Sequence, residues 1–340
     1  MEIRLNHILC HTIEEAKDAG GYEIADFLDE WSSFGDTVSG QTSGSTGIPQ
    51  KVELQKKDMI ASARLTNDFF GIKASSSMFL CLSPDYIAGK MMLVRAMIAG
   101  ADLITVKPSS SPLVGIDIPL DFAAMVPMQV QESLSHDFTR ERLKNIKSLI
   151  IGGAAVSSLL EQRLAKLPTR SYATYGMTET VSHVALRKLD GKTKEYAAIG
   201  DVWFSQDARG CLIINAPHLS HRVFETNDVV QLIDNYHFIW LGRYDNVINS
   251  GGVKLFPEKI EQKISPFISS RFFLTSQSDE RLGERLVLVI EGKRWDHEKV
   301  ELFKKKIAHV LTPYECPKLI LFKKHFQETY SGKIIRRIVE

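Results

Sequence analysis

Residues 42–47, TSGSTG, combine four hydroxyl side chains with two glycines, and a lysine follows at position 51. Glycine permits positive φ, so consecutive backbone N–H groups can point toward one concavity. Ser43, Ser45, Thr46 and Lys51 would add donors suited to phosphate oxygens. The stretch lacks the GK[ST] of a Walker loop, and on its own a Gly/Ser surface turn explains it equally well.

Five further segments carry groups that suit a nucleotide. YGMTETVSH (175–183) contains Glu179, ETND (225–228) ends in the Asp228 carboxylate, and SGKIIRR (331–337) contains Lys333. The others are LIIGGA (149–154), whose small residues would admit a flat ring, and GRYDNVINSGGVKLFPEKIE (242–261). Each has an ordinary explanation when taken alone, such as a helix-start carboxylate, a turn residue or a terminal charge. Their succession along one chain favours a common site.

The segments fall at the ends of predicted strands and helices. Apolar runs at 76–82 and 148–153 predict buried strands, and the helical spacing after the second predicts a helix. This alternation indicates β/α units on a mostly parallel sheet. Strand-like runs follow from about residue 200. After residue 250 the pattern predicts a helix from Pro257, two strands, a helix near 296–311 and a last strand.

We therefore expect an α/β protein with two domains. Residues 1–245 would form a large domain of mixed, mostly parallel sheets flanked by helices. Residues 246–340 would form a small α+β domain. The small domain holds 18 Lys+Arg against 12 Asp+Glu, which suits a polyanionic small molecule, although solvated helix faces explain the excess equally well.

Bulk composition excludes several classes of protein. A net charge of +1 gives no sign of nucleic-acid or membrane binding. The four cysteines are far apart, which argues against a zinc site or a disulfide framework and fits a reducing cytoplasm. Residues 1–30 lack the apolar run of a signal peptide, and Arg95 and Asp102 interrupt the apolar stretch 91–106. We expect a cytoplasmic protein without membrane insertion.

The motifs in this order resemble those of the AMP-forming acyl- and aryl-CoA synthetases, the adenylate-forming superfamily that includes firefly luciferase and peptide-synthetase adenylation domains. The resemblance runs from residue 42 to residue 337. TYGMTETVSHVAL (174–186) and DYIAGKMMLVRAMIAGADL (85–103) are most similar to the o-succinylbenzoate–CoA ligases of menaquinone biosynthesis. This resemblance implies a two-step ligase: a carboxylate attacks the α-phosphorus of ATP, releasing pyrophosphate, and the thiol of coenzyme A then displaces AMP.

The resemblance also implies roles for residues around ATP. The loop 42–47 would close over the β- and γ-phosphates, and Glu179, beside Thr178, would hold Mg²⁺ with help from Thr46. Asp228 would take the ribose hydroxyls. The ATP-binding set implied in this way is Thr42, Ser43, Gly44, Ser45, Thr46, Gly47, Lys51, Gly153, Ala154, Tyr175, Gly176, Asp228, Arg243 and Lys254, with Gly153, Ala154, Tyr175 and Gly176 framing the adenine.

For the C-terminal part, the resemblance implies a moving domain. Lys333 would bridge the attacking carboxylate and the α-phosphate during adenylation. Asp245 matches the family's hinge, about which the domain swings between the half-reactions. After the swing, Lys333 would leave the site, and the loop of Ser250, Gly251 and Gly252 would line the tunnel for coenzyme A.

The acid site is the less direct inference. The implied substrate carries two carboxylates, so one must be held while the other reacts. Lys90, Ser182 and His183 are candidates for holding it, with Gly152 beside them. Lys90 snorkelling to the surface and His183 packing in the core are the competing interpretations. Tyr86 falls where many relatives have a gating histidine or another aromatic residue.

Three features depart from the family pattern. Only 41 residues precede the loop, so the N-terminal subdomain is expected to be shortened, and a second subunit completing the sheet would make a homodimer. Gln50 occupies the usual lysine position, with Lys51 one place later. Asn227 replaces a glycine, and asparagine tolerates left-handed geometry nearly as well.

Two other functions remain open at this point. The chain could be a ligase for another acid, or a stand-alone adenylation enzyme that loads a carrier protein. It could also be a nucleotide-binding relative without catalysis. The presence of Glu179, Asp228, Arg243 and Lys333 argues against the last, because a pure binding protein needs no lysine on a moving domain.

Overall fold

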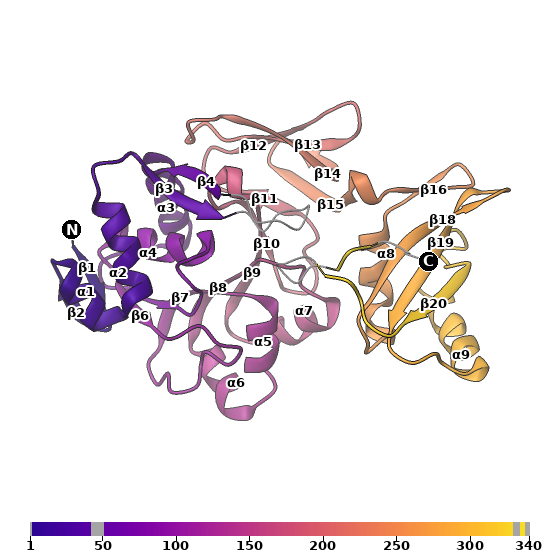
Figure 1. Ribbon diagram of the computed structural model, residues 1–340, viewed down its shortest axis with the longest axis horizontal. Coiled ribbons are helices and arrows are strands. Elements are labelled where there is room, and N and C mark those ends of the chain that lie inside the picture. Colours follow the sequence, from indigo (N-terminus) through magenta and orange to yellow (C-terminus); the bar gives the residue numbers. More distant parts are fainter. Residues whose placement is uncertain (1, 42–50, 329–333, 337–340) are drawn as a thin grey trace.

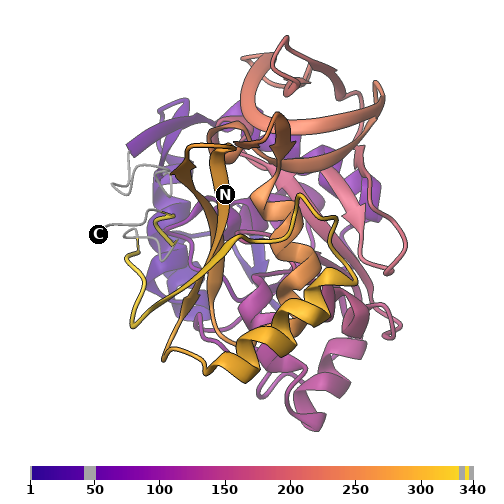
Figure 2. The same cartoon turned by 90° about the vertical axis from the view of Figure 1, so that its right-hand side faces the viewer.

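The computed structural model describes residues 2–41, 51–328 and 334–336. A large body built on one sheet occupies most of the molecule, and a smaller sheet with its helices lies at one end (Figure 1). Viewed onto that end, α9 (His297–Ala308) lies in the foreground, beside the strands of the small sheet (Figure 2).

The large sheet has 13 strands in the order β12-β13-β14-β15-β11-β10-β9-β8-β7-β5-β6-β1-β2. Their bounds are β1 (Ile3–Leu5), β2 (Ile8–Cys10), β5 (Ser77–Leu80), β6 (Asp102–Thr105), β7 (Leu120–Met125), β8 (Ile146–Ile151), β9 (Arg170–Gly176), β10 (His183–Lys188), β11 (Tyr196–Ala198), β12 (Trp203–Gln206), β13 (Cys211–Asn215), β14 (Val223–Asp234) and β15 (His237–Arg243).

The remaining described strands form two further sheets. A hairpin of β3 (Thr37–Gln41) and β4 (Lys51–Gln55) flanks the segment 42–50. The small sheet contains β16 (Ile248–Ser250), β17 (Val253–Leu255), β18 (Phe272–Asp279), β19 (Gly283–Glu291) and β20 (Leu319–Lys323).

The helices surround these sheets. They are α1 (Ile13–Gly20), α2 (Tyr22–Ser32), α3 (Lys56–Phe70), α4 (Ile87–Ala99), α5 (Pro127–Ser133), α6 (Asp137–Lys144), α7 (Ser158–Leu164), α8 (Pro257–Ile264) and α9, with single 3₁₀ turns η1 (Thr178–Thr180), η2 (Tyr244–Asn246) and η3 (Ser265–Phe267). Sequence signals explain several ends: Thr12 and Glu15 form a capping box at α1, and Gly100 ends α4 in the left-handed conformation.

The α/β class is confirmed, and the strand directions refine it. Within the large sheet, parallel pairing is confined to β1 and β5–β9, the part where strands and helices alternate. From β9 through β10, β11, β15, β14, β13 and β12, every pairing is antiparallel. The large sheet is therefore mixed rather than mostly parallel, because hairpins rather than helices connect its later strands.

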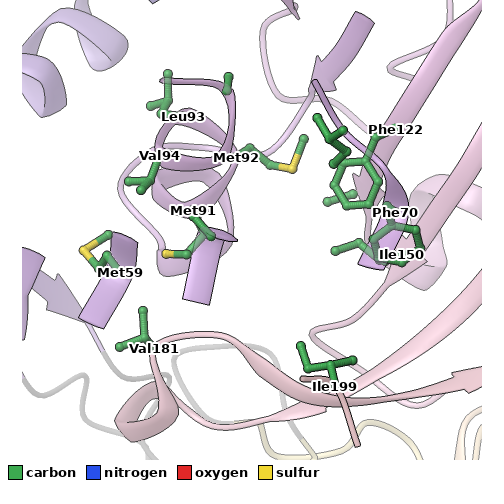
Figure 3. Packing of buried hydrophobic residues seen from close by; sticks show 14 of the residues in the cluster. Met59, Phe70, Met91, Met92, Leu93, Val94, Phe122, Ile150, Val181 and Ile199 are labelled. Atoms are coloured by element: carbon green, nitrogen blue, oxygen red, sulfur yellow. The ribbon is translucent and has the colours of Figure 1, made fainter. Parts of the chain in front are cut away.

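Helix α4 lies inside the large body and explains why its sequence is so apolar. Met91, Met92, Leu93 and Val94 are fully buried, and Figure 3 shows Met91 lying close to Met59 and Val181. A helix that is buried on every face reads as a continuous apolar run. Within the described residues, no helix is both long and apolar enough to cross a bilayer.

Separate buried clusters underlie the two sheets. The clusters of the large body draw on residues between 3 and 238, whereas those of the small sheet draw on residues between 248 and 334. The domain boundary at residue 245 remains a prediction that agrees with this arrangement.

Candidate functional site

Among the carboxylates of the predicted site, Asp228 accepts a hydrogen bond at each of its two oxygens. The Tyr175 hydroxyl donates to its Oδ2 at 2.8 Å, and Trp240 Nε1 donates to its Oδ1 at 3.1 Å. Its own backbone N–H donates to Thr226 Oγ1 at 3.1 Å. Burial and the neighbouring Asp228 charge raise the pKa of Tyr175 well above its ordinary value, so the phenol stays protonated and donates. The carboxylate is thus fixed in direction before any ligand binds.

The contact between Tyr175 and Asp228 also shows that the sheet is strongly bent. Strands β9 and β14 are separated by β10, β11 and β15 in the sheet order, yet their side chains touch. Aromatic packing fills the bend: the Tyr175 ring lies 5.0 Å from that of Phe238 and 5.8 Å from that of Tyr196. Sequence spacing could not predict this bend.

Arg243 lies beside Asp228, directly opposite it across the β14–β15 pair. Its Nη2 donates to Asp245 Oδ2 at 3.1 Å; the Arg243 side chain is 40% exposed and that of Asp245 60%. Arg243 therefore places a partly exposed cation next to the fixed carboxylate, at the predicted hinge. An exposed pair of this kind contributes at most about 1 kcal/mol, so a ligand anion can displace it.

The turn η1 joins β9 to β10 and presents Glu179. This side chain is exposed and makes no hydrogen bond or ion pair with the described residues. The chain is tightly packed at this turn: a Cβ added at Gly176 would lie 2.4 Å from Ser182 O. Val181 has φ +64°, a strained backbone conformation for a β-branched residue. On the neighbouring strand end, a Cβ at Gly152 would lie 2.4 Å from Thr174 Oγ1.

A buried polar cluster follows directly after this turn. Arg95, from α4, donates through Nη2 to Ser182 Oγ at 2.6 Å. His183 lies 3.3 Å from Ser182 Oγ through Nδ1 and 3.4 Å from Thr66 Oγ1 through Nε2. Burial, followed by the charge of Arg95, lowers the pKa of His183 well below its ordinary value. At neutral pH the cluster therefore holds a neutral imidazole and one guanidinium.

Arg95 is the residue that sequence reasoning missed. Its side chain is 1% exposed, it forms no ion pair with the described residues, and its Nε is buried without a partner. Burial lowers its pKa to about 9. A buried charge without a counter-ion is costly. The signal was visible as a single arginine in an otherwise apolar stretch, which served only to exclude a membrane span.

Lys90, a predicted acid ligand, already has a partner. It is 6% exposed, so it does not snorkel, and its Nζ lies 3.3 Å from Glu30 Oε2. Glu30 also accepts the Ser39 N–H at 2.6 Å, which ties α2 and α4 to the hairpin strand β3. Tyr86 precedes α4 and is exposed.

The other predicted residues lie at the end of β8, in η1, on the small sheet or outside the described residues. Gly153 and Ala154 are exposed beyond β8, and Thr178 is half-buried in η1. Ser250, Gly251 and Gly252 form the β16–β17 turn of the small sheet, and Lys254 is exposed on β17. The residues outside the described part of the chain are Thr42, Ser43, Gly44, Ser45, Thr46, Gly47 and Lys333. Across residues 2–41, 51–328 and 334–336, no group of three or more His, Cys, Asp or Glu could hold a metal ion.

Comparison with known proteins gives this geometry a context. A family model for AMP-binding enzymes matches residues 41–209. The chain is 37% identical to an AMP-forming acyl-CoA synthetase/AMP-acid ligase II-like protein from Dyadobacter fermentans, with a TM-score of 0.62 and coverage of 92% of this chain and 91% of that one.

Other relatives are more distant. The chain is 26% identical over 296 residues to the 2-succinylbenzoate–CoA ligase of Escherichia coli; the match covers 80% of this chain and 62% of that enzyme. The o-succinylbenzoate CoA synthetase of Bacillus subtilis, solved with its acyl-adenylate intermediate, has 17% identity and a TM-score of 0.75, and the match covers 88% of this chain and 67% of that one. The second likeness concerns the fold. The chain spans about 62% of the length of the E. coli ligase.

Proposed function

The chain belongs to the family of AMP-forming acyl-CoA synthetases and AMP-acid ligases, and from this membership we propose that it adenylates a carboxylic acid with ATP and transfers the acyl group to coenzyme A. The observation that carries the proposal is the Asp228 carboxylate. Tyr175 and Trp240 each occupy one of its oxygens as donors, and the remaining lone pairs can accept two ribose hydroxyls. Arg243, opposite Asp228, supplies positive charge for phosphate.

We propose o-succinylbenzoate as the acid. Arg95 and Ser182 offer a guanidinium and a hydroxyl in a buried site, and His183 stays uncharged beside them. This cluster suits the second carboxylate of a dicarboxylic acid, which would supply the counter-ion that Arg95 otherwise lacks. Lys90 becomes a supporting residue in this proposal, because Glu30 already neutralises it. The name and fold of the E. coli and B. subtilis relatives support the choice of acid.

Magnesium enters with the nucleotide in this proposal. Glu179 fits the ion, since its carboxylate is exposed and unpaired among the described residues, at the end of β9 where Tyr175 faces Asp228. The bound ion would neutralise charge on the phosphates. Thr46 is proposed as a second ligand. Lys333 would bring the acid carboxylate and the α-phosphate together, which is catalysis by positioning and charge neutralisation.

The remaining parts of the mechanism are proposed on the same basis. Residues 246–340 would swing about Asp245, and the turn at Ser250–Gly252 would then contact coenzyme A. The proposed setting is cytoplasmic, and a homodimer remains a prediction.

Pyrophosphate release tests the function directly. The assay contains ATP, Mg²⁺ and a panel of carboxylic acids that includes o-succinylbenzoate, with and without coenzyme A. Release with o-succinylbenzoate, together with its CoA thioester in the mass spectrum, is the expected result. Release with another acid would retain the reaction and reject the substrate. Acid-dependent release without turnover of coenzyme A would favour a carrier-loading enzyme, and no release with any acid would favour the non-catalytic relative.

A further inference from the structure

Helix α8 carries two glutamates three residues apart, Glu258 and Glu261, and both approach Arg336. Arg336 Nη1 lies 2.7 Å from Glu261 Oε1, and its Nη2 lies 2.8 Å from Oε2. Nη1 also lies 3.9 Å from Glu258 Oε1. Glu261 Oε1 further accepts the Leu274 N–H at 2.7 Å. The guanidinium therefore meets a carboxylate whose position is fixed by the small sheet.

Arg336 lies three residues after the segment 329–333, and the described residues on either side of that segment are paired. Glu328 and Ile334 form an antiparallel bridge, and the Ile335 N–H donates to Gln327 O at 2.9 Å. Residues 327–328 and 334–335 are thus held side by side by antiparallel pairing. Lys333 is adjacent to this pairing in sequence.

A second arginine holds the chain before the segment. Arg271 binds the Glu328 carboxylate, and its Nε lies 2.6 Å from Glu291 Oε2. Glu291 also accepts the Phe326 N–H at 2.8 Å. Ion pairs therefore fix both flanks of the segment, Arg271 before it and Arg336 after it.

The same helix reaches the predicted hinge. Asn246 Nδ2 donates to Glu258 Oε1 at 2.5 Å. Glu258 Oε2 is buried with no partner among the described residues, and it lies so close to Gly242 that a Cβ there would be 2.5 Å away. Asn246 and Gly242 lie on either side of Asp245 and Arg243. One face of α8 therefore contacts the hinge through Glu258 and the Arg336 segment through Glu261.

We infer that Glu261 and Arg336 are positioning residues for Lys333, and that α8 links the presentation of this lysine to the hinge through Glu258. The inference rests on the proposed function, in which Lys333 acts only in adenylation. A forked arginine–carboxylate pair fixes direction as well as distance, which an ordinary surface pair does not. When the pair is broken, residues 334–336 keep their backbone pairing with residues 327–328 but lose their attachment to α8.

The expected effect is selective for one half-reaction. A misplacement of about 1 Å in a catalytic group can cost about 100-fold in rate, so Glu261→Gln and Arg336→Lys should slow adenylation about 10- to 100-fold. Thioester formation from supplied acyl-adenylate should stay within about twofold, because Lys333 is away from the site in that step. A merely structural role would lower both rates together.

The experiment measures both half-reactions and hydrogen–deuterium exchange of the peptides covering residues 324–336. The variants are Glu261→Gln and Arg336→Lys, with Lys263→Gln as the matched control. Lys263 lies on the same helix and forms its own ion pair with Glu315 at 2.6 Å, away from the Arg336 segment. Faster exchange at 324–336 together with selective loss of adenylation, in the Glu261 and Arg336 variants but not the control, is the expected result.

Other results would overturn the inference. Equal loss of both half-reactions, or full adenylation in both variants, contradicts a positioning role. If the wild-type protein adenylates no acid, the proposed function fails instead, and the exchange measurement still tests the attachment, since unchanged exchange in Glu261→Gln would rule it out. If Glu261→Gln does not fold, Arg336→Lys keeps the charge and decides the question alone.

Discussion

The two halves of the proposed active site are held by different interactions. In the large body, Asp228 is fixed by the Tyr175 hydroxyl and the Trp240 indole within a buried aromatic cluster. In the small C-terminal part, the described residues on either side of 329–333 are fixed by arginine–carboxylate pairs, and the Arg271 side chain is half-exposed. The first half is a rigid receptor, and the second is held by ion pairs that are only partly buried.

This difference suits the roles proposed for each half. A group that receives the same ribose in every cycle gains from directed hydrogen bonds in a water-excluded setting, which need no reorganisation. The C-terminal part is proposed to move away from the site between the half-reactions. Ion pairs within that part can therefore hold it together in both positions. The Arg336–Glu261 and Arg271–Glu291 pairs join residues 246–340 only to each other, so a rotation at Asp245 would leave them intact.

The largest effect is expected from removing the lysine that the small domain presents. Lys333→Ala should lower adenylation by about 100- to 1,000-fold, the loss typical of a single group that stabilises developing charge. Thioester formation from supplied acyl-adenylate should persist. Single-turnover assays of each half-reaction measure the two effects, with Lys305→Ala, an exposed lysine on α9, as control. Equal loss of both half-reactions would show that Lys333 is not specific to the adenylation step.

A smaller effect is expected on the rigid side. Asp228→Asn removes a charged acceptor, and hydrogen bonds to charged groups are worth about 1.5 to 3 kcal/mol. The KM for ATP should rise about 10- to 100-fold, whereas the KM for the acid should not change. Tyr175→Phe, which removes only a donor that orients Asp228, should give a smaller rise. A change in the acid KM of similar size would mean that Asp228 shapes the whole site rather than the ribose contact.

Arg95 offers a test of the acid site that separates function from stability. Arg95→Met should raise the KM for the acid about 10-fold or more and leave the KM for ATP unchanged. Because the guanidinium is buried without a counter-ion, its loss should leave the free energy of unfolding equal or higher, by up to about 2 kcal/mol. Denaturant unfolding measures this. A large loss of stability would instead identify Arg95 as a structural residue.

The strands, helices and local motifs were predictable from the sequence because their signals are local. The apolar runs at 76–82 and 148–153 correspond to β5 and β8, and the helix from Pro257 is α8. The α/β class followed from the same periodicity. The Tyr175 partner of Asp228 was not predictable, because it reaches Asp228 through a bend in the sheet that brings β9 to β14. Trp240 reaches it from the directly paired strand β15.

The sequence also did not predict which charged side chains pair with each other over long distances in the chain. Lys90 and Arg95 lie five residues apart on the same buried helix, but among the residues that the structure describes only Lys90 pairs with a carboxylate, on α2. No local pattern states which cation is neutralised, since the answer depends on how α2 and β10 pack against α4. For the same reason the excess of basic residues after residue 245 did not reveal that Arg271 and Arg336 are engaged within their own domain.

The smallest effect concerns the pH dependence of the Arg271–Glu291 ion pair. The Arg271 guanidinium lowers the pKa of Glu291 to about 2, from an ordinary value of 4.5. A carboxylate whose pKa is lowered by folding stabilises the protein above its unfolded pKa, and this contribution disappears as the pH falls through the folded pKa. The Tm difference between the wild type and Arg271→Gln should therefore be constant above about pH 5 and shrink between pH 4.5 and 2. Lys293→Gln, which removes a neighbouring exposed cation, should show no such step in thermal unfolding followed by circular dichroism. A Tm difference that grows as the pH falls would mean that Arg271 acts through repulsion and not through Glu291. The claim that ion pairs hold the C-terminal part would then be wrong.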